Sequence, residues 1–348
     1  MVFHDYLTLI IPSIIGFVFT IIAAKFLMGY MMESGVTSPD HNKKGRPTLP
    51  AGVGLSVAIA FSIGILVILL LIIFAAGIAG GLLGSLSGLG GGAVIAPLLS
   101  IYLGFPLYYA TGASLISTIA TSAGSASQYV KSHIANMRIG LSLSVGTTLG
   151  AITGSLLAVY MYSAHMDDII YIIFGIVLLA SSSLELERLL RKRRMKKPKP
   201  DWTTRLLGLS GKYYEETTKD EIHYIGRRWH LSLVVMYLAG LLSGLLGIGA
   251  GALKVLGMDI IMGLPIKVTT TTSNFMIGVT AATSSGIYWA HGFIQPLIVA
   301  PAAVGVIIGA VIGARMLPRL PREEIRAVFI AVIVVLGVQM ILRGLGIA

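Results

Sequence analysis

Hydrophobic residues stand in this chain in long unbroken runs that are separated by short polar segments. The first run covers residues 7–28, and a polar segment with Lys43, Lys44 and Arg46 follows it. A membrane-spanning helix needs about 20 mostly apolar residues, so this run predicts one span. The next run, residues 53–103, is about twice that length and contains many glycines. Further spans are predicted at residues 108–130, 139–162, 169–187, 231–263, 268–289, 297–316 and 325–342.

The composition agrees with a protein embedded in lipid. Hydrophobic residues make up 55% and charged residues 12% of the 348 residues, and the mean hydropathy is +0.86. This charged share is about half that of a soluble globular protein, which excludes an ordinary soluble enzyme. A disordered chain is also excluded, because disorder needs low hydrophobicity. Continuous apolar runs also argue against the alternating strands of a β-barrel. The predicted fold class is therefore all-α, a polytopic helical membrane protein.

Residue types that bind metals or react as nucleophiles are scarce. The chain contains no cysteine, which excludes disulfides and thiol catalysis. No group of His, Asp and Glu has metal-ligand spacing, and no Ser has an evident His–Asp partner. The sequence therefore predicts no metal, no cofactor and no catalytic residues.

The formal net charge of +11 is concentrated in one segment. Residues 185–230 hold 13 of the 26 Lys and Arg residues, including the run from Arg191 to Lys197. Basic residues accumulate in loops on the cytoplasmic side of a membrane. Residues 188–230 are therefore predicted to be a cytoplasmic basic linker that faces anionic membrane lipid rather than nucleic acid.

The two halves of the chain resemble each other at an offset of 159 positions. Gly90 and Gly92 then fall on Gly249 and Gly251, and the register holds without a gap as far as Gly154. An internal duplication is therefore predicted. The expected organisation is a two-span accessory extension at 1–71, a first repeat at 72–187, the linker at 188–230 and a second repeat at 231–348.

Loop charge indicates how the two repeats are oriented. The loop with Lys131 and Arg138 corresponds to residues 290–296, which contain no Lys or Arg, and the acidic loop at 167–168 corresponds to an arginine-rich loop. Exchanged loop charge is what inverted repeats predict. Inversion requires each glycine-rich run to enter and leave the membrane on one side, as two half-helices broken at the glycines. One long crossing in each run would instead make the repeats parallel.

Two dense glycine clusters interrupt the apolar runs. Glycine destabilises a helix by about 1 kcal/mol relative to alanine, and irregular backbone survives in a membrane only inside protein or around a wet cavity. Broken helices in mid-membrane present free N–H groups that favour anions. The substrate-binding residues predicted in these clusters are Gly88, Gly90, Gly91, Gly92, Gly247, Gly249, Ala250 and Gly251. Close helix packing, the competing interpretation, better fits the stripes Gly146–Gly150–Gly154 and Gly305–Gly309–Gly313.

Polar side chains near the clusters complete the candidate site. Ser114, Ser273 and Asn274 lie at the starts of spans, where such side chains bind an oxyanion or cap the helix. Lys254 lies in an apolar run where a charge is costly, and it is expected to hold the anion or to pair with Asp259. Candidate gating or proton-relay residues, which also suit interfacial anchors, are Tyr129, His133, Tyr288 and His291.

These motifs resemble the sulfite exporter TauE/SafE family of membrane permeases over residues of about 72–345. The resemblance lies in the sequence from Gly88 to Gly92 with Pro97 and in the similar sequence from Gly247 to Gly251. It also lies in the Gly-x-Pro and Ser/Thr helix starts that follow each of them. It implies a duplicated permease for sulfite, sulfoacetate or related organosulfur anions. The second half departs from the pattern at Ala250 and Leu256, which leaves the exact substrate open.

The N-terminal part resembles a different family. Residues 40–50 are similar to the first cytoplasmic loop of polyprenyl-phosphate sugar-1-phosphate transferases. The similarity ends near residue 71, and the aspartate-rich catalytic segments of that family are missing. Residues 1–71 are therefore interpreted as an accessory extension of a protein that is not an enzyme.

The function predicted from the sequence is secondary transport of a small anion, sulfite or an organosulfonate, across the cell membrane by alternating access. An anion channel is one alternative, and a membrane sugar-1-phosphate transferase is a more remote one. The expected coupling ion is a proton or sodium. The direction of transport and the oligomeric state stay open.

Overall fold

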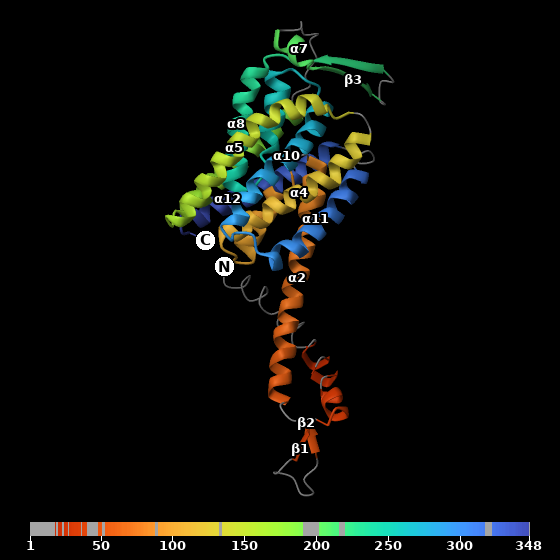
Figure 1. Cartoon of the computed structure of the whole chain (residues 1–348), viewed down its shortest axis with the longest axis vertical. Coiled ribbons are helices and arrows are strands. Elements are labelled where there is room, and N and C mark those ends of the chain that lie inside the picture. Colours follow the sequence, from red (N-terminus) through yellow and green to blue (C-terminus); the bar gives the residue numbers. More distant parts are fainter. Residues whose placement is uncertain are drawn as a thin grey trace. The chain divides into compact units, whose positions relative to one another are not determined.

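The chain divides into two compact units, Met1–Ile72 and Ile73–Ala348, which are described separately. The computed structural model (Figure 1) describes most of residues 18–39, and residues 48–50, 53–87, 90–131, 134–190, 202–215, 220–316 and 322–347.

The first unit holds the N-terminal helix residues and a short pair of strands. The described residues between 18 and 33 are helical, within and just after the first predicted span. Strand β1 (Thr37–Pro39) pairs antiparallel with β2 (Thr48–Pro50). Most of the segment that resembles a transferase loop lies outside the described residues.

Helix α2 (Val53–Ser87) begins in the first unit and continues into the second as one helix of 35 residues. The division between the units, after Ile72 and next to the boundary predicted at residue 71, falls inside this helix. The reason is local, since residues 65–76 contain neither glycine nor proline and consist of Ile, Leu, Val, Phe and Ala, so nothing there terminates a helix.

The second unit is built from two series of helices. The first series is α3 (Gly92–Pro97), the π-helix η1 (Leu98–Tyr102), α4 (Leu107–Lys131), α5 (Met137–Ser163) and α6 (Asp167–Leu190). The second series is α8 (Trp229–Leu246), α9 (Gly251–Leu256), the π-helix η2 (Gly257–Ile261), α10 (Ile266–Ala290), α11 (Pro296–Met316) and α12 (Arg322–Gly344).

The offset of 159 found in the sequence also relates these elements. The bounds of α9, η2 and α10 are those of α3, η1 and α4 plus 159, and α11 begins 159 residues after α5. A π-helix follows both short helices, although Pro97 stands in one and Leu256 in the other. Proline is therefore not needed for the π-helical turn.

Six of the described helices are long and apolar enough to cross a membrane. They are Val57–Ser85, Met137–Ser163, Asp167–Glu187, Trp229–Leu246, Pro296–Gly313 and Ala327–Gly344. This confirms the predicted class of polytopic helical membrane protein. Helices α4 and α10 are also long, with 25 residues each, but they are rich in Ser and Thr. These two helices pack against each other, and α11 and α5 pack against them in turn.

The glycine stripes serve close helix packing, as the sequence predicts. A Cβ atom at Gly150 or Gly154 would overlap the carbonyl oxygen of Tyr237 or Leu241 on α8. On the other side of the unit, a Cβ at Gly309 would overlap the carbonyl oxygen of Ile78 on α2. Residues 78 and 237 are again 159 apart, as are 150 and 309. Each half-helix before a glycine cluster therefore packs on a helix of the other series.

The second unit has two distinct ends. At one end, rings of Tyr108, Tyr162, Tyr288 and Phe293 form an aromatic cluster with centroid distances of 5.1 Å for Tyr108–Phe293, 5.6 Å for Tyr162–Phe293 and 5.9 Å for Tyr288–Phe293. The element η1 returns to this end, because Ser100 on η1 bonds the hydroxyl of Tyr171, in the second turn of α6, at 2.5 Å.

The opposite end carries a small folded cap. Helix α7 (Trp202–Leu207) and strands β3 (Ser210–Glu215) and β4 (Asp220–Ile225) occupy part of the segment predicted to be a linker. The strands are antiparallel, with Ser210 opposite Ile225. Leu209, Tyr213 and Tyr224 of the cap join a buried hydrophobic cluster with residues of the helical bundle. Those residues come from α5, α8, η2, the loop after η2 and α10. They are Ile139, Leu143, Met236, Met258, Met262, Leu264, Val268 and Met276.

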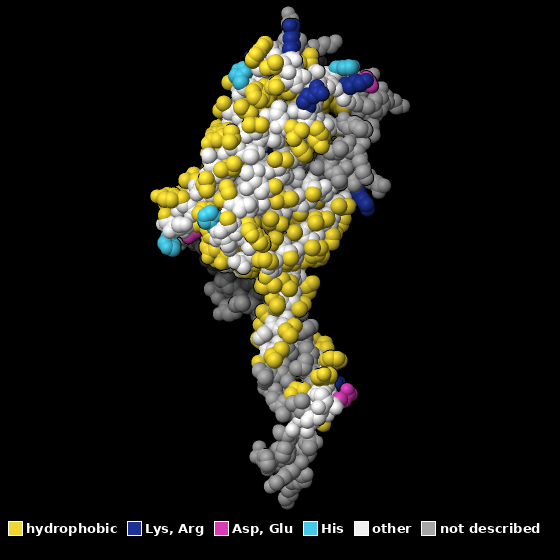
Figure 2. Space-filling view, viewed as in Figure 1, with side chains coloured by type: hydrophobic (Ala, Val, Ile, Leu, Met, Phe, Trp, Pro, Cys, Tyr) yellow, Lys and Arg dark blue, Asp and Glu magenta, His cyan; other side chains and the backbone are white. Residues whose placement is uncertain are grey.

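Charge also differs between the two ends. In Figure 2 the visible face of the helical unit is largely hydrophobic, and Lys and Arg side chains gather near α7 and the hairpin. The described basic residues of this end include Arg138, Arg205, Lys212, Arg227 and Arg228. The start of α6, near the aromatic cluster, has Asp167 and Asp168 in its first turn.

Candidate substrate site

The glycine clusters break both long apolar runs in the middle of the second unit. Helix α2 stops at Ser87 and α3 starts at Gly92, while α8 stops at Leu246 and α9 starts at Gly251. Gly90 has a φ of +87°, and Gly247 and Gly249 have +70°. Glycine adopts this left-handed conformation without the steric cost that a Cβ brings. Gly88 lies outside the described residues.

The two clusters meet at Ser114 on α4. Its Oγ lies 2.8 Å from the carbonyl oxygen of Gly92 and 2.7 Å from that of Gly247. A Cβ placed on Gly92 would lie 2.9 Å from the same Gly247 oxygen. The structure thus brings together Gly92, Ser114 and Gly247. The single hydroxyl proton of Ser114 faces two carbonyls, so in this arrangement Ser114 links the clusters.

The corresponding serine of the second series behaves similarly. Ser273 on α10 donates to the carbonyl oxygen of Gly251 at 3.4 Å, a long contact, and residues 273 and 251 correspond to 114 and 92 at the same offset. The neighbouring Asn274 accepts from Ser122 of α4 through its backbone carbonyl at 2.5 Å. Its side-chain Nδ2 is buried and has no hydrogen-bond partner among the described residues.

Two further hydroxyls on α4 are buried without a described partner, Ser117 Oγ and Thr118 Oγ1. Thr118 is fully buried. A Cβ on Gly92 would overlap Thr118 Oγ1, and one on Gly90 would lie 3.5 Å from its methyl group. The hydroxyl therefore lies directly against the backbone at the start of α3. Sequence reasoning missed Thr118, although it follows Ser114 by four residues on the same helix face.

Lys254 on α9 is fully buried. Its Nζ donates to Thr280 Oγ1 of α10 at 2.8 Å, and Thr280 donates in turn to the Met276 carbonyl at 2.7 Å. In the first series, the corresponding Thr121 accepts from the backbone N–H of Gly91 at 3.3 Å. The two threonines occupy equivalent places, and the second accepts from a lysine side chain where the first accepts from a backbone N–H. The described ion pairs do not include one between Lys254 and Asp259.

Ala250 replaces glycine at a demanding position of the second cluster. It has a φ of +47°, in the left-handed region, which costs a residue with a Cβ roughly 1–2 kcal/mol. The corresponding Gly91 has a φ of −65°. The two clusters therefore differ in backbone geometry at this position.

The gating candidates occupy different environments. Tyr288 is fully buried in the aromatic cluster, and its hydroxyl donates to the carbonyls of Gly244 and Leu245 at 3.2 Å, just before the second glycine cluster. His291 is exposed at the end of α10, and its Nδ1 lies 2.8 Å from the Ile287 carbonyl. The side chain of Tyr129 and the whole of His133 lie outside the described residues.

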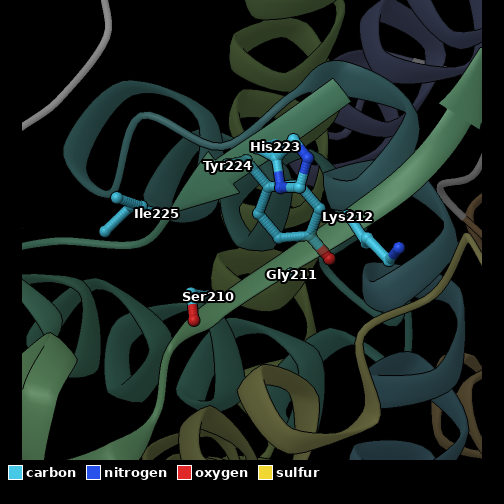
Figure 3. Close-up of a pocket in the computed structure, with 6 residues that line it drawn as sticks. All are labelled: Ser210, Gly211, Lys212, His223, Tyr224 and Ile225. Atoms are coloured by element: carbon cyan, nitrogen blue, oxygen red, sulfur yellow. The ribbon is translucent and has the colours of Figure 1, made fainter. Parts of the chain in front are cut away.

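A separate hollow of about 370 Å³ lies on the cap (Figure 3). It is lined by the hairpin residues Ser210, Gly211, Lys212, His223, Tyr224 and Ile225. Burial raises the pKa of the Tyr224 hydroxyl, which also accepts from Asn136 Nδ2 at 3.1 Å. None of the predicted substrate residues lines this hollow.

The buried glycine-broken helices inside a bundle of apolar helices define a membrane transport protein of the broken-helix type. The chain matches the family described as "Sulfite exporter TauE/SafE" over residues 72–340. It belongs to this family. The resemblance found in the sequence is thereby confirmed.

Three relatives from Bacillus subtilis (strain 168) carry transporter names. The chain is 26% identical to the "Probable membrane transporter protein YunE" over 277 residues, 77% of this chain and 96% of the relative. For YdhB, with the same description, the identity is 22% over 71% of this chain and 90% of the relative. For YjnA, also with this description, the identity is 25% over 76% of this chain and 97% of the relative. No solved structure matches the chain. Family and relatives identify a multi-pass membrane transporter and not an enzyme.

Proposed function

We propose that this protein is a secondary transporter that moves a small anion, sulfite or an organosulfonate, by alternating access. The observation that carries the proposal is a set of buried donors without described partners, Ser117 Oγ, Thr118 Oγ1 and Asn274 Nδ2. An unpaired buried polar group costs about 1–3 kcal/mol, and a ligand with several acceptor oxygens would offer such donors the partners that they lack. Thr118 faces the start of the helical segment Gly92–Tyr102, and the N-terminal end of a helix favours negative charge.

Neutral donors suit an oxyanion that has to leave the site again. Hydroxyl, amide and backbone N–H groups bind oxygen without the large desolvation cost of a second ion. Lys254 places one amino group beside the second cluster, which is a positive charge whenever it is protonated. This combination supports an anionic substrate, and membership of a family of sulfite exporters supports oxidised sulfur as its class.

The aromatic cluster and the cap give the proposed transporter a barrier at each end. The aromatic cluster of Tyr108, Tyr162, Tyr288 and Phe293 would close the site at the end where α4 begins. The buried cluster around Tyr224 would close it at the cap end. Opening one barrier at a time is the physical content of alternating access. We place the basic cap on the cytoplasmic side, because positive residues accumulate there. In this orientation we propose that the two repeats cross the membrane in opposite directions.

Flux of radiolabelled sulfite and sulfoacetate into proteoliposomes tests the proposal, with Thr118→Val as the diagnostic variant. Valine keeps the shape of threonine and removes the hydroxyl. A hydrogen bond to a charged group contributes about 1.5–3 kcal/mol, so kcat/KM is expected to fall roughly 10-fold or more. Thermal stability in detergent is expected to stay equal or rise, because an unpaired buried hydroxyl disappears.

Thr283→Val is the matched control, because among the described residues this α10 hydroxyl bonds just the carbonyl of Val279 on its own helix, at 3.0 Å. Its flux is expected to equal that of the wild type. Equal flux for Thr118→Val and the wild type would overturn the site assignment. Counterflow that accelerates uptake distinguishes a carrier from a channel, since a channel lacks an obligatory return step.

A further inference from the structure

Lys254 is an unusual ionisable residue, because its side chain is fully buried and has a neutral hydroxyl as its only described hydrogen-bond partner. The Nζ atom bonds Thr280 Oγ1 at 2.8 Å, and the side chain has no exposed surface. An ammonium ion removed from water needs a paired anion and several hydrogen bonds to be stable. One hydroxyl does not meet that need, so these surroundings by themselves favour the neutral amine.

No described ionisable group forms an ion pair with Lys254. Helix α9 packs against α8, α10, η2 and α6. The ionisable residues on these elements whose side chains are described are His230 and Tyr237 on α8, Lys267 and Tyr288 on α10, Asp259 on η2, and Asp167, Asp168, Tyr171, Glu185 and Glu187 on α6. The described ion pairs involve none of them with Lys254. A bound substrate anion would therefore be the natural partner of the ammonium form.

The hydrogen bond to Thr280 keeps the side chain in place in both charge states. Thr280 uses its own proton on the Met276 carbonyl at 2.7 Å, so its oxygen accepts from Lys254. Both an amine and an ammonium have an N–H to donate. The nitrogen can thus gain and lose a proton without a rearrangement of α9 against α10.

Polar groups extend from this position along α10 toward the aromatic end. Thr280, Ser284 and Tyr288 follow each other at intervals of four residues, which places them on one helix face, and all three are fully buried. Ser284 Oγ, and Ser243 Oγ on α8, have no described partner. Buried polar atoms of this kind are the usual sites of internal water, which would give a proton a path.

We propose that Lys254 carries one proton together with each substrate anion, an inference that rests on the transport function proposed above. On the side where the anion enters, a hydronium ion of the solvent gives a proton to the free amine: its O–H bond breaks, an N–H bond forms, water is left, and the ammonium pairs with the anion. On the other side the anion leaves, the N–H bond breaks and the proton returns to water. The charge exists in one half only, since Ile95 is the counterpart of Lys254, so the ratio is one proton per anion.

The experiment uses the full chain in proteoliposomes with a trapped pH-sensitive dye and labelled sulfoacetate. This probe stays fully ionised near neutral pH, whereas sulfite takes up a proton of its own and would obscure the measurement. The wild type is expected to carry one proton with each sulfoacetate and to accumulate it when the outside is acidic. Sulfoacetate flux with no proton movement would overturn the inference and leave the transport function intact. Absence of flux for both sulfoacetate and sulfite would overturn the transport function itself.

Two substitutions at position 254 separate charge from titration. Lys254→Arg keeps a permanent cation, because arginine does not deprotonate in proteins, so anion exchange is expected to persist while coupled proton flux disappears. Lys254→Met removes the cation, and coupled proton flux is again expected to be lost. Lys267→Met is the matched control at the start of α10, with coupling unchanged. Proton flux at the wild-type ratio in either variant of Lys254 would overturn the proposal.

Thr280→Val tests how Lys254 is positioned. Loss of the hydroxyl acceptor weakens the ammonium form, so the pH for half-maximal uptake is expected to fall by about one unit. The ratio of protons to anions should stay the same. A merely structural role for Thr280 would lower the maximal rate and leave this pH midpoint where it is, which would contradict the positioning role.

Discussion

Two hydroxyls one turn apart on α4 differ in what they can offer a ligand. Ser114 is bound between the carbonyls of Gly92 and Gly247, whereas Thr118 has no described partner. The residue types at the helix start could be predicted from the sequence, and so could the location of Lys254 away from lipid. Which hydroxyl stays unpaired could not, because that depends on the distance between helices whose contact is set by residues over 100 positions apart.

Gly247 offers a test of the contact between the clusters at the scale of one residue. Its φ is +70°, and a Cβ there would lie 2.7 Å from the methyl group and 2.9 Å from the carbonyl oxygen of Thr111. Gly247→Ala is expected to lower the melting temperature in detergent and to abolish most transport, because Thr111 is one turn from Ser114. Melting followed by size-exclusion chromatography and proteoliposome flux measure the two effects.

Gly292→Ala is the control for backbone strain alone. Gly292 has a φ of +72°, and a Cβ there would meet no atom within 4 Å. Both alanines bear the left-handed cost of roughly 1–2 kcal/mol, and only the first displaces a neighbour. Equal losses of stability and flux in the two variants would show that the Thr111 contact is unimportant.

At the scale of elements, patterns with a strong period were predicted and weak ones were missed. The broken helices followed from glycine spacing, and both π-helical continuations fall within the predicted runs. The hairpin was missed because its segment is polar and highly charged. Its signal was the pair of short apolar-aromatic stretches around Tyr213 and Ile222 with the polar residues 216–219 between them. Burial of Tyr213 and Tyr224 against α5 and η2 turns that weak local preference into structure.

The packing of α5 on α8 is testable through its glycine stripe. A Cβ at Gly150 would overlap the carbonyl oxygen of Tyr237 and lie 2.8 Å from the backbone nitrogen of Leu241. Backbone atoms cannot move aside as side-chain ends can, so Gly150→Ala is expected to separate the helices. Overpacking of this kind costs about 1–3 kcal/mol, and thermal melting in detergent should show a clear loss.

Gly286→Ala on α10 is the matched substitution in a helix. Gly286 is exposed, and a Cβ at this position would have open space within 4 Å. Alanine is the better helix former by about 1 kcal/mol, so this variant should melt at the same temperature as the wild type or higher. If Gly150→Ala were as stable as Gly286→Ala, the stripe would have no packing role.

At the scale of the whole molecule, the arrangement of the two helix series decides how the protein sits in a membrane. The contacts place η1 at the end with the aromatic cluster, since Arg343 near the end of α12 donates to the Ile101 carbonyl at 3.4 Å. They place η2 at the opposite end, since the backbone N–H of Arg227, just before α8, donates to the carbonyl of Met262, just after η2, at 3.3 Å. The sequence predicted opposite ends from loop charge alone. It could not supply the pairing of α2 with α11 and of α5 with α8, because that pairing joins the two halves.

The absence of cysteine from the chain makes inversion of the repeats directly testable. Ser163 and Arg315 are exposed residues at or near the ends of α5 and α11, two helices that start 159 residues apart. Inverted repeats place these ends on opposite sides of the membrane, and parallel repeats place them on the same side.

In intact cells, a membrane-impermeant maleimide is expected to label Ser163→Cys and to spare Arg315→Cys until the membrane is permeabilised. Lys212→Cys in the cap should behave like Arg315→Cys, because the cap and the loop after α11 both carry the basic residues that mark the cytoplasmic side. Labelling of Ser163→Cys and Arg315→Cys from the same side would refute inversion, and labelling of Lys212→Cys in intact cells would refute a cytoplasmic cap.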